Sequence, residues 1–169
     1  GLLLSARARQ YATTGRMRQS LEAAYEGLAI MGINFNSEPT SGDVDEEKSQ
    51  ILQNLGGRPI EALINMPDST DEKSKIASQL IMEIFPAAFL SASGVMFPYL
   101  VLKSVNISLK AGNSPEAAFS YAAYGMLLCG YFNDPALGYA YGKLGVDMIE
   151  KFNDISLKSR IIYVYAMFI

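Results

Sequence analysis

The residues that could support catalysis are few in this sequence and lie far apart. Histidine is absent, which removes the commonest general base and metal ligand and argues against Ser-His, Cys-His and His-zinc chemistry. Glu83 and Lys103 each flank an apolar stretch and could form an acid–base pair, but nothing in the sequence brings them together. We interpret them instead as charges at helix ends. The sequence therefore predicts no catalytic residue, no cofactor-binding residue and no metal ligand, in a chain that is not itself an enzyme.

The single cysteine and the net charge restrict the possible partners further. Cys129 lies inside an apolar stretch, so we expect a small buried side chain in a reducing, cytoplasmic compartment rather than half of a disulfide. Gly56-Gly57-Arg58 lacks the spacing and the Lys-Ser/Thr ending of a phosphate-binding loop. A net charge of −3 provides no clustered Lys and Arg for nucleic-acid phosphates. We expect neither a nucleic acid partner nor a bound nucleotide.

Tyrosines recur beside the apolar segments and admit two interpretations. They could turn their rings and hydroxyl groups toward one apolar pocket, as in a ligand-sensing domain. They could instead pack between helices with the hydroxyl group at an edge, which is favoured because tyrosine commonly buries its ring in this way. The candidate pocket residues are Tyr99, Tyr121, Tyr124, Tyr131, Tyr139 and Tyr141.

One segment, residues 112–134, is expected to position the others as a central helix. Ser114 can cap its first turn, Pro115 suits the first helical position, and Glu116 complements the positive end of the helix dipole. Residues 117–129 carry no charge and mix small with large side chains, so neighbours must cover most of the helix circumference. Gly125 is unfavourable at mid-helix and therefore predicts a close helix–helix contact.

Helical spacing and cap residues recur through the rest of the chain. Asp134 and Asp154 are expected to cap the last two helices, and capping boxes are expected at Asp43 with Glu46 and at Ser69 with Glu72. Residues 34–42 form a polar, turn-rich loop that we expect to be mobile and replaceable. The expected helices cover residues 1–14, 16–31, 43–54, 59–66, 70–90, 95–111, 135–152 and 155–169.

An uncharged run of nineteen residues, 84–102, is long enough to cross a bilayer. Pro86, Pro98 and Gly94 divide it, which favours two buried helices joined by a corner. Residues 2–4 are too short for the core of a signal peptide and are followed by Arg7. We expect neither a membrane span nor a membrane partner.

The N-terminal helix pair resembles a tetratricopeptide repeat. Gly15, Met17, Ser20, Ala24 and Gly27 fall where that repeat places its turn glycine, a large apolar residue and three small residues. Residues 124–127 also resemble residues 165–168, at an offset of forty-one. We expect an all-α fold of antiparallel helix pairs stacked as a short tetratricopeptide-like solenoid. It is a single domain over 1–169, with a first hairpin over 1–33, a loop over 34–42 and the remaining helices over 43–169.

A second resemblance concerns GRPIEALINMPDSTDEKSKIASQLIMEIFPAAFLS at 57–91 and GNSPEAAFSYAAYGMLL at 112–128. These segments resemble the helical repeat region of very large bacterial signalling kinases, which combine a serine/threonine kinase domain, a predicted signal-transduction ATPase, a GAF sensor and often a histidine kinase. The resemblance covers residues 15–169 and implies that this chain is part of a longer one. It also implies a non-catalytic module that binds a partner protein or a neighbouring domain.

The chain end predicts an association surface. Residues 161–169, IIYVYAMFI, carry no charge, whereas the terminal repeat of a solenoid needs a polar outer face. We expect an exposed apolar patch at Tyr163, Met167 and Phe168, and self-association through it as a two-fold dimer.

Overall fold

The computed structural model describes residues 2–90 and 93–169, and these residues confirm the all-α fold class. They form eight α-helices and one 3-10 helix, η1. In chain order the elements are α1 (Leu2–Thr13), α2 (Met17–Ile30), α3 (Ser41–Leu55), η1 (Ile60–Asn65), α4 (Glu72–Phe89), α5 (Met96–Ala111), α6 (Pro115–Gly130), α7 (Pro135–Phe152) and α8 (Ile155–Phe168).

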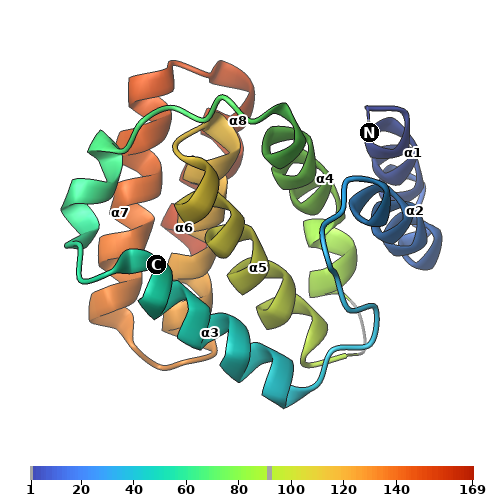
Figure 1. The fold of residues 1–169 in the computed structure, drawn as a ribbon, viewed down its shortest axis with the longest axis horizontal. Helices are drawn as coiled ribbons and strands as arrows, with labels where there is room; N and C mark the ends of the chain where they lie inside the picture. Colours follow the sequence, from blue (N-terminus) through green and yellow to red (C-terminus); the bar gives the residue numbers. More distant parts are fainter. Residues whose placement is uncertain (1, 91–92) are drawn as a thin grey trace.

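The helices do not pack entirely in chain order. In Figure 1, α1 and α2 lie at the right edge, and α4, α5, α6 and α7 follow from right to left. α3 packs against α5, and in the described residues it makes no contact with α4, the next α-helix in the chain. The order of packing therefore departs at α3 from a regular stack of consecutive pairs.

α6 is the central helix, as its sequence predicts. Every residue from Ala117 to Leu128 is buried, because α4, α5, α7 and α8 surround the helix. Cys129 differs from the expectation: its side chain is half-buried, since it lies in the last turn, where α6 reaches the surface.

Side-chain caps fix where the helices begin. Ser114, Asp134 and Asp154 accept backbone N–H groups at the starts of α6, α7 and α8, as predicted. The other two predicted capping boxes are wrong. Thr40 caps α3 with Asp43 at its third position, and Asp71 caps α4 by accepting from two N–H groups.

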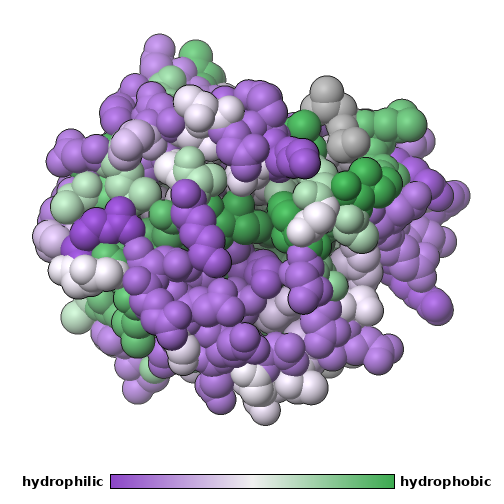
Figure 2. All heavy atoms as spheres, viewed as in Figure 1, coloured by the Kyte–Doolittle hydropathy of each residue, from purple (hydrophilic) through white to green (hydrophobic). Residues whose placement is uncertain are grey.

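Two hydrophobic cores hold the helices together. The larger core includes residues of α3, α5, α6, α7 and α8, and the smaller one lies among α1, α2, α4 and α5. Three phenylalanines pack against both cores: Phe35, Phe85 and Phe97. The view in Figure 2 is largely hydrophilic over α3, because that helix buries only its inner residues, and hydrophobic atoms form a band above it.

Asn113 fastens the segment between η1 and α4 to the start of α6. This segment runs along the top of Figure 1 from η1 to α4. The Asn113 backbone N–H donates to the Pro67 carbonyl at 2.9 Å, and the Asn113 carbonyl accepts from the Ser69 N–H at 2.7 Å. The buried Asn113 side-chain amide donates to the Leu63 carbonyl at 2.9 Å. These bonds join η1 and the segment before α4 to the residue that precedes the cap of α6.

The loop over 34–42 is shorter than expected, because α3 begins at Ser41. It is also anchored. The Phe35 ring stacks on Tyr25, with centroids 5.2 Å apart, and meets Tyr99 edge-on at 5.1 Å. The Asn36 backbone N–H donates to the Tyr99 hydroxyl at 3.0 Å.

Because Phe35 packs against both cores, Phe35→Ala should lower the free energy of unfolding by about 2 kcal/mol, through lost aromatic contact and burial. Urea unfolding measures this change. Ile30→Ala is the control, since Ile30 is exposed at the end of α2 and should change stability little. If the two variants are equally stable, Phe35 does not anchor the loop, and the loop is the mobile, replaceable segment that its composition predicts.

Candidate functional site

The six candidate tyrosines do not surround one cavity. Tyr121, Tyr124 and Tyr141 form a buried cluster between α6 and α7, with the Tyr124 and Tyr141 ring centroids 4.7 Å apart and those of Tyr121 and Tyr141 6.1 Å apart. Burial raises the pKa of Tyr124 to about 12, because ionisation would place a charge among buried side chains. These three rings act as packing residues between helices.

The other three tyrosines lie elsewhere. Tyr99 borders a polar hollow of about 470 Å3 between α3, α5 and the loop after α2. The polar groups of that hollow bond to one another, since Asn36 donates to Tyr99 and Lys103 donates to Glu47. Tyr131 and Tyr139 are exposed.

Glu83 and Lys103 are not brought together, and neither lies at a helix end. Glu83 lies within α4 and accepts from Arg9 at 2.7 Å, whereas Lys103 lies within α5 and donates to Glu47 at 2.7 Å. Their interpretation as helix-end charges is therefore wrong. Each is half of an ion pair that joins distant parts of the chain.

The main apolar hollow is a groove between α4 and α8 with α6 as its floor, which we call the α4–α8 groove. It has a volume of about 480 Å3 and is open to solvent along one side. In the described residues the backbones of α4 and α8 make no close approach, so side chains alone span the gap. The lining residues are Met82, Phe85, Pro86, Phe89, Phe119, Met126, Ser159, Arg160, Tyr163, Val164 and Phe168.

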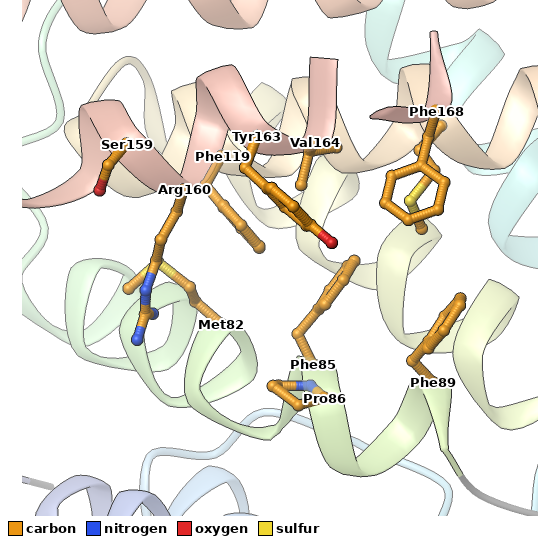
Figure 3. A pocket seen from close by; sticks show the side chains of 11 residues that line it. Met82, Phe85, Pro86, Phe89, Phe119, Ser159, Arg160, Tyr163, Val164 and Phe168 are labelled. Carbon is orange, nitrogen blue, oxygen red and sulfur yellow. The ribbon is translucent and has the colours of Figure 1, made fainter. Parts of the chain in front are cut away.

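Aromatic rings form both walls of the groove. In Figure 3, Phe85 and Phe89 rise from α4 toward α8, and Tyr163 and Phe168 descend from α8. The Phe89 and Phe168 ring centroids lie 6.5 Å apart and close one end. Phe119 packs edge-on against Phe85, with centroids 5.1 Å apart, which joins the floor to the α4 wall.

One face of α8 builds this wall while the other holds the helix in the core. Leu157 and Ile161 are buried in the core and do not line the groove, and Ile169 approaches Gly125 and Gly142. The predicted association residues Tyr163, Met167 and Phe168 are all exposed, as expected. Two of them, Tyr163 and Phe168, also line the groove.

Sequence reasoning missed the α4 wall and Arg160. Phe85 and Phe89 directly follow Ile84 and Ala88, which are fully buried in the smaller core. Two apolar faces on one helix were the available signal, because only one of them is needed to bury α4 in its own core. Phe89 remains half exposed.

The described parts of the chain contain neither a membrane-spanning helix nor a metal-binding cluster. Within 2–90 and 93–169, no helix combines the length and apolar character that crossing a membrane requires, and the uncharged run over 84–102 is divided between α4 and α5. The same residues contain no group of three or more His, Cys, Asp or Glu side chains placed to hold a metal ion.

Comparison with known proteins finds no family model, no curated protein and no solved structure that matches this chain. Function is therefore argued from the geometry of the α4–α8 groove.

Proposed function

We propose that this chain is a non-catalytic protein-interaction module whose docking surface is the α4–α8 groove. The observation that carries the proposal is an open, apolar hollow with aromatic walls, extended by exposed Tyr163, Met167 and Phe168. Exposed apolar patches of this kind mark sites of protein association. An amphipathic helix is the natural occupant, because its apolar ridge fits a groove between two helices.

The composition of the first helix pair supports a tetratricopeptide-like character. Ser20, Ala24 and Gly27 are buried on α2, as the repeat pattern requires. A Cβ atom at Gly27 would lie 2.6 Å from the Leu80 side chain and 3.5 Å from the Leu4 Cβ, so small residues here allow α1, α2 and α4 to approach closely.

The biological setting that we propose follows from the resemblance of segments 57–91 and 112–128. The chain acts as the coupling region of a large bacterial signalling kinase in the cytoplasm, and the groove binds a helix of a neighbouring domain or of a signalling partner. A second copy of the chain is the competing occupant, since the two-fold dimer expected from the chain end would use the same exposed rings.

Site-specific photocrosslinking in the full-length protein tests this function. A photoreactive phenylalanine analogue at Tyr163, which is 58% exposed on the groove, should crosslink to one discrete helical segment. The matched control is the same analogue at Tyr139, which is 54% exposed but does not line the groove. Crosslinks from 163 to a second copy would identify the dimer as the occupant. Equal, scattered crosslinks from both positions would contradict a docking role for the groove.

A further inference from the structure

Positive charges outnumber negative charges at one end of the α4–α8 groove. The Glu83 side chain is 4% exposed and receives a hydrogen bond from Arg9 at 2.7 Å. Arg160 Nη1 lies 4.0 Å from the same Glu83 oxygen, beyond hydrogen-bond distance, and its side chain is 49% exposed. Two guanidinium groups thus share one carboxylate, which leaves a net positive charge on the groove side.

Arg160 is the group that remains available for a partner. Glu83 is its one ion-pair partner among the described residues, and Arg9 holds that carboxylate more closely. In Figure 3 the Arg160 side chain extends from α8 toward α4 at the end of the groove opposite Phe89 and Phe168. A second carboxylate could therefore bind Arg160 while Arg9 continues to neutralise buried Glu83.

The opposite end of the groove is apolar, so the two ends differ and a bound helix would have one preferred orientation. Phe89 and Phe168 close that end with two rings and no charge. Phe168 lies eight positions after Arg160 on α8, which corresponds to about 12 Å along the helix. A helix laid along α8 would cover this distance in about two turns.

We propose that the groove selects an amphipathic helix with a carboxylate at the Arg160 end and a bulky apolar side chain about two turns away. The inference rests on the proposed docking function and names the chemistry of the partner. The carboxylate would form a charge-assisted pair with Arg160 in a partly desolvated position, which fixes the orientation of the docked helix. The apolar side chain would pack against the Phe89 and Phe168 rings at that end.

Charge argues against α8 of a second copy as this occupant. Residues 155–169 contain no Asp or Glu, so a second α8 would bring Lys158 and Arg160 rather than a carboxylate to the basic end. The exposed rings of Tyr163 and Phe89 extend the contact surface beyond the cavity, which favours a helix over a small anionic amphiphile.

Selection from a displayed peptide library tests the inference. The library consists of helical peptides of about fifteen residues, the length at which isolated helices become stable, with apolar positions at helical spacing and other positions randomised. The baits are the parent chain, Arg160→Glu and Lys158→Glu. Lys158 is the matched control, because it lies on the same helix, is 42% exposed, and pairs with Glu150 away from the groove.

The parent should enrich Asp or Glu about two turns from a bulky apolar anchor, and Arg160→Glu should change that preference to Lys or Arg. Lys158→Glu should leave the acidic preference unchanged. Arg160→Gln, which adds no negative charge beside Glu83, should weaken binding of a selected acidic peptide about tenfold, the effect of losing one charged pair at an interface. Thermal unfolding of each bait confirms that it is folded.

The outcomes separate this inference from the function on which it rests. Helices selected without an acidic preference, or with the same preference by Arg160→Glu, would overturn the inference and leave the docking function standing. No enriched helix would overturn both. In that event, dodecanoate is the second probe: stabilisation of the parent but not of Arg160→Gln would assign the groove to an anionic amphiphile instead.

Discussion

Gly125→Leu is expected to destabilise the fold by roughly 3 kcal/mol or more, because the new side chain has no space. A Cβ atom alone at Gly125 would lie 2.6 Å from the Gly138 carbonyl oxygen and 2.8 Å from the Gly142 backbone nitrogen. Both neighbours are backbone atoms of α7, so α7 must move away before any side chain fits. The midpoint of urea or thermal unfolding measures the effect.

Gly130→Ala is the matched control for this substitution. Gly130 ends the same helix, and nothing lies within 4 Å of the position that its Cβ atom would take. Alanine there should be neutral, or stabilising by a few tenths of a kcal/mol through helix propensity. Parent-like stability of Gly125→Leu would mean that α6 and α7 do not approach as closely as described.

Glycines make this approach possible along much of the α6–α7 contact. A Cβ atom at Gly145 would lie 2.7 Å from the Ala118 carbonyl oxygen, and one at Gly138 would lie 2.8 Å from the Gly125 carbonyl oxygen. The two backbones therefore pack with no side chain between them. Ile169, at the chain end, approaches Gly125 and Gly142, so the same contact positions α8 and its groove wall.

Local features of this fold could be predicted from the sequence because their signals are local. The caps at Ser114, Asp134 and Asp154 each accept a hydrogen bond from an N–H group within the next three residues. The burial of α6 is predicted by its uncharged run of alternating small and large side chains. Gly125 could be predicted as a packing position, because glycine destabilises the middle of a helix and usually occurs there where a close contact requires it. These predictions are confirmed.

Long-range pairing could not be predicted in the same way. Arg9 and Glu83 lie seventy-four residues apart in sequence, and nothing beside either one indicates the other. The contact of α3 with α5 includes a hydrogen bond from Asn106 to Glu47, two polar residues that apolar periodicity does not identify. The interpretation of Lys103 and Glu83 as helix-end charges failed for this reason.

Of the two walls of the candidate site, only the α8 wall could be predicted from the sequence. The exposure of Tyr163, Met167 and Phe168 was predicted from the uncharged segment over 161–169. The facing wall of Phe85 and Phe89 was not predicted, because both residues lie in an uncharged run that we interpreted as two buried helices. Neither segment identifies the other from sequence. Their juxtaposition depends on α6, which packs against both α4 and α8.

An ion pair between buried Glu47 and partly buried Lys103 joins α3 to α5, and breaking it gives the second large expected effect. Lys103 Nζ lies 2.7 Å from Glu47 Oε1, with side chains that are 19% and 6% exposed. Asn106 donates its side-chain amide to Glu47 Oε2 at 2.8 Å and to the Glu47 carbonyl at 2.9 Å. The Glu47 carboxylate is therefore held by one cation and one amide, at a side chain that is itself almost fully buried.

Lys103→Met should lower the free energy of unfolding by about 3 kcal/mol, because it leaves the buried Glu47 carboxylate without its cation. Lys143→Met is the control: Lys143 pairs with Asp147 on the surface of α7, where loss of a pair should cost less than about 1 kcal/mol. Adding Glu47→Gln to Lys103→Met should restore part of the loss, since the amide carries no charge and can still accept from Asn106. Urea unfolding of Lys103→Met, Glu47→Gln, the double variant and Lys143→Met completes the comparison with the parent. If the double variant is as unstable as the sum of its single variants, or if Lys103→Met matches Lys143→Met, the unpaired charge is not the cause and the α3–α5 contact depends on apolar packing at Val44 and Ile51.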